Sequence, residues 1–157
     1  MTILEKLENA SQIKQWSDTI PTKYLYSYGI AGERFFREIQ NNGRLMAAKC
    51  KNCKLTYLPP RLYCEECFEK LDAWTPVKPE GEVNSYTTAH IDIDRTRLKE
   101  PAILAFIKFR GVKGGMIHKL ENIGKTRVQI GMKVKPRFRP KPNRTGSILD
   151  IEYFEPI

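Results

Sequence analysis

The spacing of apolar residues predicts a helical N-terminal part followed by a strand-rich part. Within residues 3–16, apolar side chains recur at intervals of three or four, which places them on one stripe of a helix. They are Ile3, Leu4, Leu7, Ala10, Ile13 and Trp16. A second short helix is expected over residues 33–40, closed by Asn42 and Gly43, because these two residue types tolerate a left-handed cap.

Short strand-like runs separated by glycines follow residue 81. They cover residues 82–91, 102–109, 116–120, 126–130, 132–138 and 147–154. This spacing is typical of an all-β barrel or sandwich. The proline- and glycine-containing linker over residues 75–81 predicts a boundary before the first of these strands.

Composition indicates a folded protein of modest size. Of 157 residues, 41% are hydrophobic and 29% charged, which suits one domain, or a small domain with a stapled module. No apolar run approaches the roughly 18 residues that a membrane helix needs, and the N-terminal residues are charged where a signal peptide is apolar. We therefore expect a cytoplasmic protein.

The net charge of +9 is concentrated in the second half of the chain. Residues 1–80 hold 12 basic and 10 acidic side chains, whereas residues 81–157 hold 15 and 8. Such a field favours an anionic partner, whether a nucleic acid, an acidic protein surface or a phosphorylated cofactor.

All four cysteines lie in two C-x2-C pairs separated by ten residues. They are Cys50, Cys53, Cys64 and Cys67. Each pair forms a tight knuckle, and two knuckles supply the four sulfurs of a tetrahedral structural zinc site. Iron is a rival in the same geometry, and free cysteines or a redox pair are the alternatives without a metal. A module of some thirty residues has too small a core to fold without its metal.

Cations alternate with apolar residues in the last third of the chain. The alternating cations are Lys133, Lys135, Arg137, Arg139 and Lys141, and Arg144 continues the series. In an extended segment they share one face and are suited to contact phosphates. The competing interpretation is a solvated strand whose charges and prolines protect an edge against aggregation.

Two other functions receive less support from the residues. A single-stranded nucleic-acid binder would use aromatic stacking, but the aromatic residues do not interleave with the basic run. His90 and His118, the two histidines, stand in no motif that supplies a nucleophile or an orienting carboxylate, and we expect structural roles for both. The chain alone is not expected to be an enzyme.

Five segments together resemble a known family. They are FFREIQNNGRLMAAKCKNC, PPRLYCEEC, GEVNSYTTAH, PAILAFIKFRG and IGMKVKPRFRP, in this order. The chain resembles the zinc-ribbon plus OB-fold acyl-CoA-associated proteins, long catalogued as a domain of unknown function. The resemblance implies a mainly β protein with an N-terminal helical hairpin (1–43), a rubredoxin-like zinc ribbon (44–78) and a C-terminal OB-fold barrel (79–157).

The same resemblance implies a function. Members of this family are accessory, non-catalytic subunits of thiolase-type enzymes. These subunits scaffold the enzyme and help to enclose acyl-CoA. Carried over to this sequence, the cations expected to face the phosphates of coenzyme A are Arg137, Arg139, Lys141 and Arg144. The aromatic residues expected to anchor a partner or line an acyl path are Tyr24, Tyr26, Tyr28, Phe35 and Phe36, for which ordinary core packing is the alternative.

Overall fold

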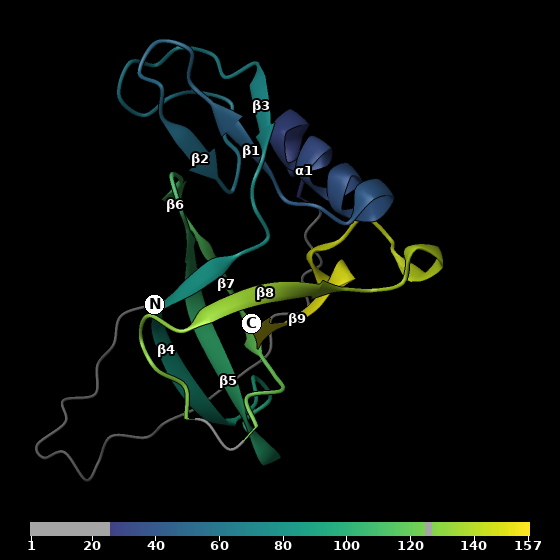
Figure 1. Cartoon of the computed structure of the whole chain (residues 1–157). Coiled ribbons are helices and arrows are strands. Elements are labelled where there is room, and N and C mark those ends of the chain that lie inside the picture. The colour runs from purple at the N-terminus through teal and green to yellow at the C-terminus, as the bar shows by residue number, and fades with distance from the viewer. Residues whose placement is uncertain (1–25, 125–126) are drawn as a thin grey trace, which may run out of the picture.

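The computed structural model describes residues 26–124 and 127–157. Within these residues the chain forms one α-helix, nine strands and two short 3-10 helices (Figure 1). The helix predicted over residues 3–16, and with it the helical hairpin, lies outside the described residues and stays a prediction. No helix among the described residues is both long and apolar enough to cross a membrane.

Helix α1 (Gly29–Asn42) confirms the second predicted helix, although it begins at Gly29 and not at residue 33. Its buried residues Ala31, Phe35 and Ile39 recur every four positions and form one stripe. The helix ends as expected, because Gly43 adopts a left-handed conformation (φ 59°) and its amide donates to the Ile39 carbonyl at 3.0 Å.

The cysteine region is built on a small sheet of four strands. In spatial order they are β3 (Ala73–Pro76), β1 (Met46–Lys49), β2 (Thr56–Leu58) and β6 (Lys113–Gly114). The first three are antiparallel neighbours, whereas β6 pairs parallel to β2. Because β6 comes from the C-terminal half of the chain, this sheet joins two segments that are distant in sequence.

The C-terminal half forms a closed five-stranded barrel. Its strands are β4 (Gly81–Ile91), β5 (Arg97–Phe109), β7 (Met116–Leu120), β8 (Lys133–Phe138) and β9 (Ile151–Pro156). They close in the order β4-β5-β7-β9-β8, with a parallel pair between β7 and β9. A five-stranded barrel of this connectivity is an OB fold, so the predicted mainly β architecture with an OB barrel is confirmed.

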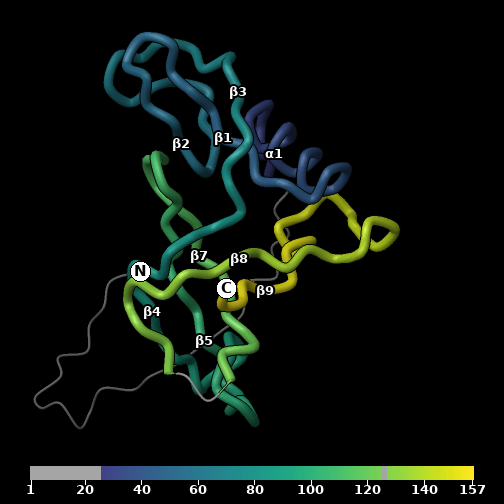
Figure 2. Tube along the Cα trace, viewed as in Figure 1, coloured from purple at the N-terminus to yellow at the C-terminus, as the bar shows by residue number. Residues whose placement is uncertain are grey.

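One hydrophobic core connects the helix, the base of the ribbon sheet and the barrel. Phe35 from α1 packs in the same buried cluster as Leu58 from β2, and as Ile107 and Phe154 from the barrel. In Figure 2 the tip of the β5–β6 segment reaches up to the ribbon, and α1 lies beside the ribbon and above the C-terminal loop. The division into residues 44–78 and 79–157 stays a prediction.

Two strand predictions are wrong in part. Residues 127–130 form no strand, although the Val128 side chain is buried in the core. Residues 148–150, predicted as part of the last strand, form a 3-10 helix instead. The reason is the carboxylate of Asp150, which draws three successive backbone amides into a turn before β9 begins.

Candidate metal centre

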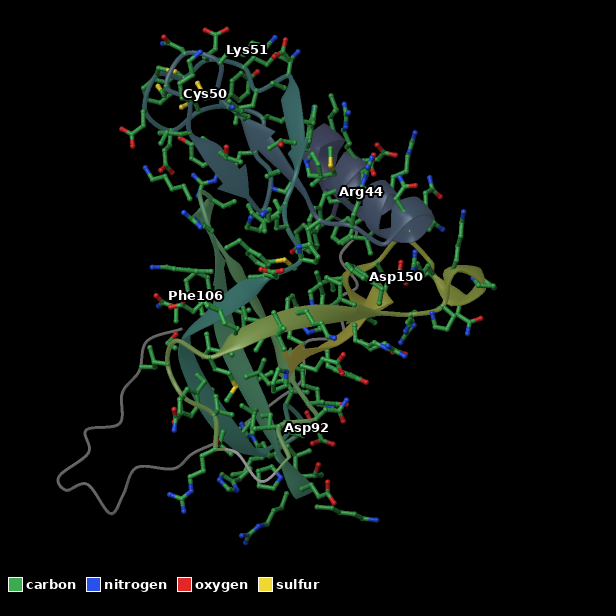
Figure 3. The ribbon with its side chains drawn as sticks, in the orientation of Figure 1. Arg44, Cys50, Lys51, Asp92, Phe106 and Asp150 are labelled. Atoms are coloured by element: carbon green, nitrogen blue, oxygen red, sulfur yellow. The ribbon has the colours of Figure 1, made fainter. Side chains whose placement is uncertain are left out.

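Cys50 lies at the end of the ribbon that is remote from the barrel (Figure 3), and the other three cysteines group with it. Their Sγ atoms all lie within 4.8 Å of one another, and those of Cys50 and Cys67 are 3.6 Å apart. Cys50 and Cys64 are buried, whereas Cys53 and Cys67 are half-buried. Each knuckle therefore contributes one sulfur from the interior and one nearer the surface.

The two knuckles repeat the same backbone design. The Cys50 amide donates to the carbonyl five residues later at 2.8 Å, and the Cys64 amide does the same at 2.9 Å. The fourth residue after each of these cysteines, Lys54 and Phe68, has a left-handed backbone, with φ 63° and 58°. Both turns thereby return the chain so that their sulfurs face a common point.

This donor set fits a tetrahedral metal ion. Bonds of about 2.3 Å from zinc to sulfur imply sulfur–sulfur distances of about 3.8 Å, close to the separation between Cys50 and Cys67. Around the sulfurs, Ala48, Tyr57, Leu71 and Trp74 form a second hydrophobic cluster. The four cysteines form a zinc-ribbon site, and zinc held there would stiffen the ribbon.

Tyr57 tunes one of the four sulfurs. Its side chain is buried, and its hydroxyl lies 3.2 Å from Cys64 Sγ, to which it donates when the sulfur is a thiolate. This hydrogen bond lowers the pKa of Cys64 to about 6 and raises the pKa of Tyr57 to about 12. The hydrogen bond that the Cys53 thiol donates to Cys67 instead raises the pKa of Cys53 to about 12. Because adjacent thiolates repel, the set ionises fully only around a cation.

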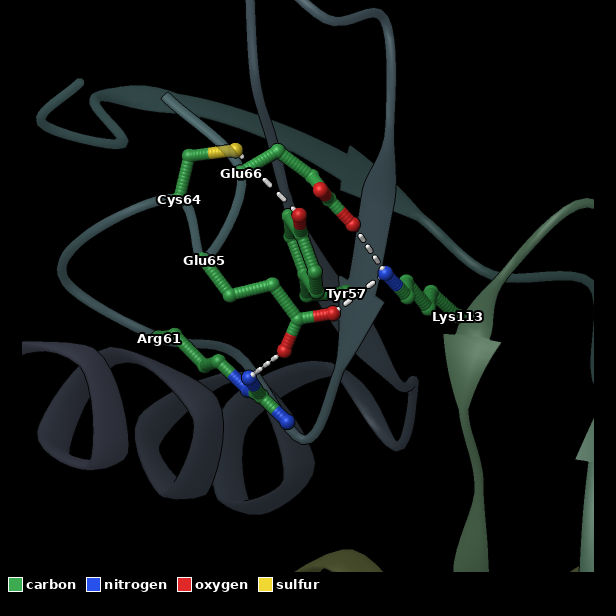
Figure 4. A network of polar contacts seen from close by, with 6 residues as sticks. All are labelled: Tyr57, Arg61, Cys64, Glu65, Glu66 and Lys113. Atoms are coloured by element: carbon green, nitrogen blue, oxygen red, sulfur yellow. Dashed lines mark hydrogen bonds and ion pairs between the residues drawn. The ribbon is translucent and has the colours of Figure 1, made fainter. Parts of the chain in front are cut away.

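A polar network connects the second knuckle to the barrel (Figure 4). Lys113 on β6 forms ion pairs with Glu65 and Glu66, the two residues between Cys64 and Cys67, and Glu65 also pairs with Arg61. The Arg61 guanidinium lies 5.4 Å from the centre of the Tyr57 ring. The hydrogen bond from Lys113 lowers the pKa of Glu65, and the same interaction with the Glu65 carboxylate raises the pKa of Lys113.

Glycines close this junction. Gly114 follows Lys113 with φ 95°, and a Cβ at this position would lie 2.3 Å from the Leu58 carbonyl oxygen. The next residue, Gly115, donates its amide to that same oxygen at 2.8 Å. The β5–β6 turn therefore approaches β2 at a distance that leaves no space for a side chain at Gly114.

The predicted basic patch is divided by the structure. Arg137 and Lys141 are exposed, and Arg139 is half-buried. Arg144 turns away from them: its guanidinium donates to the Arg139 carbonyl at 2.7 Å and lies 3.5 Å from the carbonyls of Ile39 and Gln40 at the end of α1. Arg144 thus helps to cap the helix. Contact of these four residues with coenzyme A stays a prediction.

The predicted aromatic set is also divided. Tyr26 and Tyr28 are 83% and 62% exposed at the start of α1, whereas Phe35 is buried in the shared core and Phe36 is half-buried. Tyr24 lies outside the described residues. The two exposed tyrosines are thus placed where a partner can reach them, while Phe35 has a packing role.

Three polar groups that stabilise the structure were not predicted from the sequence. They are the Asp150 carboxylate, the Lys113 ammonium and the Tyr57 hydroxyl. For Asp150 a signal was present, since Ser147 and Asp150 have the spacing of a capping box and both of its hydrogen bonds form. Burial raises the pKa of the Asp150 carboxyl, but hydrogen bonds from the amides of Thr145, Gly146 and Ser147 outweigh it, and the pKa is lowered. For Lys113 no local pattern marks the contact, because its partner Glu66 is 47 residues away.

A metal-binding ribbon joined to an OB barrel through a shared core defines the class: a zinc-ribbon and OB-fold protein. Two family descriptions match the chain accordingly. Residues 38–72 match "ChsH2, rubredoxin-like zinc ribbon domain", and residues 74–139 match "ChsH2, C-terminal OB-fold domain".

The chain belongs to the DUF35 family. A crystallised DUF35 protein of unknown function from Sulfolobus solfataricus is 34% identical, with a TM-score of 0.60 over 69% of this chain and 78% of that one. A "DUF35 domain-containing scaffold protein" of Methanocaldococcus jannaschii is 27% identical over 79% of this chain and 89% of its own length. The solved "Ltp2-ChsH2(DUF35) aldolase" shares the fold, with a TM-score of 0.62 at 20% identity, over 84% of this chain and 98% of that chain.

Proposed function

We propose that this chain is a non-catalytic accessory subunit that scaffolds a thiolase-type enzyme of acyl-CoA metabolism in the cytoplasm and helps to enclose the acyl-CoA. The observation that carries the proposal is a four-sulfur site in a chain that is related over most of its length to a scaffold protein. Four cysteine ligands complete the tetrahedral shell of zinc, so the metal has no open position for a substrate. Its role is to hold the ribbon rigid against the barrel.

Exposed aromatic side chains support a docked partner. Tyr26, Tyr28 and Ile30, all more than 60% exposed, cluster at the start of α1. Aromatic residues are enriched in protein interfaces because they bury a large area at a small loss of conformational entropy. The ion pairs and shared core hold α1, ribbon and barrel as one unit that can present this surface.

The overall charge supports an anionic ligand. The net charge of +9 favours the phosphates of coenzyme A electrostatically. The nucleophile and the acid-base groups would come from the thiolase partner. This chain would contribute a rigid binding surface and the positive charge that attracts the phosphates.

Co-purification tests the proposal. An affinity-tagged chain recovered from its native cells should retain a thiolase-type enzyme, identified by mass spectrometry, and the activity of that enzyme should fall when the chain is removed. A chain with Tyr26→Ser and Tyr28→Ser should retain less of the partner, whereas exchange of the exposed tyrosine of the ribbon, Tyr63→Ser, should leave retention unchanged. Recovery of the chain alone, with a cognate thiolase equally active in its absence, would contradict the proposal.

Single-stranded nucleic-acid binding is the alternative function, and it can be tested with the same purified chain. Backbone-driven binding weakens steeply as salt is added and tolerates many sequences. Filter binding of unrelated oligonucleotides at two salt concentrations distinguishes the two functions, since an acyl-CoA subunit should bind none of them tightly at physiological salt.

A further inference from the structure

A cleft separates the ribbon from the barrel on the side where β3 connects to β4. Its volume is about 470 Å³, within the usual range for small-molecule sites. Its lining comes from the three antiparallel ribbon strands, the connection that follows β3 and the turn after β5, namely Lys49, Thr56, Thr75, Pro76, Val77, Lys78, Glu80, Arg110, Gly111 and Val112. In Figures 1 and 2 the connection from β3 runs down beside the β5–β6 segment, so the cleft lies between parts far apart in sequence.

Three cations and one carboxylate line this cleft. The cations are Lys49 from β1, Lys78 from the connection and Arg110 from the turn, and the carboxylate is Glu80. All three cations are exposed, and none forms an ion pair with any residue that the structure describes. Elsewhere on the surface many lysines and arginines are paired, as Lys113 and Lys133 are.

Two hydroxyls add neutral donors to the same lining. Thr56 on β2 and Thr75 on β3 flank the central strand β1, and their hydroxyls make no hydrogen bond within residues 26–124 and 127–157. Val77 and Val112 supply apolar wall, and Gly111 has open space around its Cα. A concave lining with unpaired cations and donors concentrates the field on a small anion.

We propose that this cleft is a binding site for a phosphate-bearing ligand, with Lys49, Lys78 and Arg110 as its cations. Arginine binds two phosphate oxygens at once with its planar guanidinium, while the lysines act as point charges on the remaining oxygens. The excess of two positive charges over Glu80 suits a diphosphate better than a single carboxylate. The choice of coenzyme A as the natural diphosphate rests on the proposed function, whereas the anion site itself does not.

The basic patch on residues 133–144, which includes β8, is the competing site for the same ligand. There Arg137 and Lys141 are exposed, but Arg144 is directed to the end of α1 and Lys133 and Lys135 pair with Glu82 and Glu155. Arg137, Arg139 and Lys141 are not among the residues that line the cleft between ribbon and barrel. The cleft between ribbon and barrel therefore has more unpaired positive charge on a concave surface than the basic patch has.

Calorimetric titration of the full-length, zinc-loaded chain tests the site. The probes are pyrophosphate, ADP and coenzyme A, with sodium sulfate at equal ionic strength as a control for charge alone. The variants Lys78→Gln and Arg110→Gln should each weaken binding of pyrophosphate by about tenfold, since each loses a charge-assisted hydrogen bond. Arg137→Gln, which removes an equally exposed cation from the basic patch, should leave the affinity within about twofold of the parent. Zinc content and thermal unfolding confirm that each variant is folded.

The outcomes separate the site from its natural ligand. Loss of affinity in the two cleft variants and not in Arg137→Gln supports the site; coenzyme A binding much more tightly than pyrophosphate identifies a nucleotide ligand, and equal binding identifies a simple diphosphate. Failure of every probe to bind, equal losses in all three variants, or cleft variants that bind like the parent would overturn the proposal. A chain that binds diphosphate in the cleft but retains no thiolase contradicts the proposed function and leaves the site intact.

Discussion

The ammonium of Lys113 lies 2.6 Å from the carboxylate of Glu66, although 47 residues separate them in sequence. Glu66 is in the second zinc knuckle and Lys113 is in the barrel segment that enters the ribbon sheet. This pair, with the parallel bridge between β2 and β6, ties the metal-binding end of the ribbon to the barrel. Zinc binding and barrel position are therefore mechanically connected.

Replacement of Lys113 by methionine should lower the melting temperature at neutral pH, and the loss should vanish in acid. Lys113 lowers the pKa of Glu65 below its ordinary value of 4.5. A depressed carboxyl pKa in the folded state contributes stability above the unfolded pKa, and this stability is lost as pH falls through the folded pKa. Thermal melts of both proteins should therefore converge below pH 4.5. Lys99→Met, an exposed lysine without an ion pair in the described residues, serves as control, and a Lys113 deficit that persists at low pH would contradict the mechanism.

Replacement of Gly114 by alanine should destabilise the protein by about 2 kcal/mol or more. A left-handed backbone with a Cβ is unfavourable by itself, and here the Cβ meets the Leu58 carbonyl oxygen at 2.3 Å. Gly111→Ala is the matched control, because Gly111 has a similar backbone (φ 72°) with nothing within 4 Å of its Cβ position. Chemical denaturation should show a much smaller loss for Gly111→Ala, and equal losses would mean that the close approach of β6 to β2 is unimportant.

Removal of the Tyr57 hydroxyl should weaken zinc binding. Tyr57→Phe deletes the hydrogen bond to Cys64 while keeping the buried ring, and loss of such a partner of a metal ligand typically reduces affinity by about 10-fold to 100-fold. Competition with a chromogenic chelator measures the change. The exposed Tyr63 provides the control, since Tyr63→Phe should bind zinc like the parent. Elemental analysis of the parent protein should give one zinc per chain, and iron in its place would revise the metal.

Replacement of Phe68 by glycine should stabilise the ribbon by about 1 kcal/mol. Phe68 is 79% exposed, so little packing is lost, and its left-handed backbone (φ 58°) is one that glycine adopts without strain. The neighbouring Lys70 is exposed and is not among the residues with positive φ, so Lys70→Gly should have the opposite sign. Denaturant titration distinguishes the two, and a loss of stability in Phe68→Gly would assign that ring a packing role.

Replacement of Asp150 by asparagine should destabilise the protein by about 2 kcal/mol, because an amide nitrogen replaces one oxygen that accepts backbone hydrogen bonds in a buried site. The native carboxyl has a pKa below its ordinary value of 3.8, so its contribution is present above that pH and is lost as pH falls further. The difference in unfolding free energy should therefore be constant near neutrality and shrink below pH 3.8. Asp92→Asn, in an exposed turn, should cause little change.

Local patterns in the sequence were sufficient for most elements. The apolar stripe of α1, its glycine cap, the knuckle spacing and most barrel strands depend on residues within a few positions of one another, and their physics is local. The strand predicted at residues 126–130 is wrong over the described residues 127–130, because a strand also requires a neighbouring strand to pair with. Val128 is buried, and the residues around it have a strand-like composition. Whether they form a strand, however, depends on which segment lies beside them to accept and donate backbone hydrogen bonds.

The sequence by itself therefore determined the four-sulfur metal set, a helix over residues 33–40 with its glycine cap, and a strand-rich C-terminal half. The tertiary structure alone decided that β6 joins the ribbon sheet, that Arg144 caps α1 instead of extending the basic patch, and that Lys49, Lys78 and Arg110 share a cleft. The physical reason is separation along the chain. A C-x2-C knuckle or a helix cap is completed within five or six residues, whereas these contacts form between segments that meet only after the common core of Phe35, Leu58 and Ile107 has assembled.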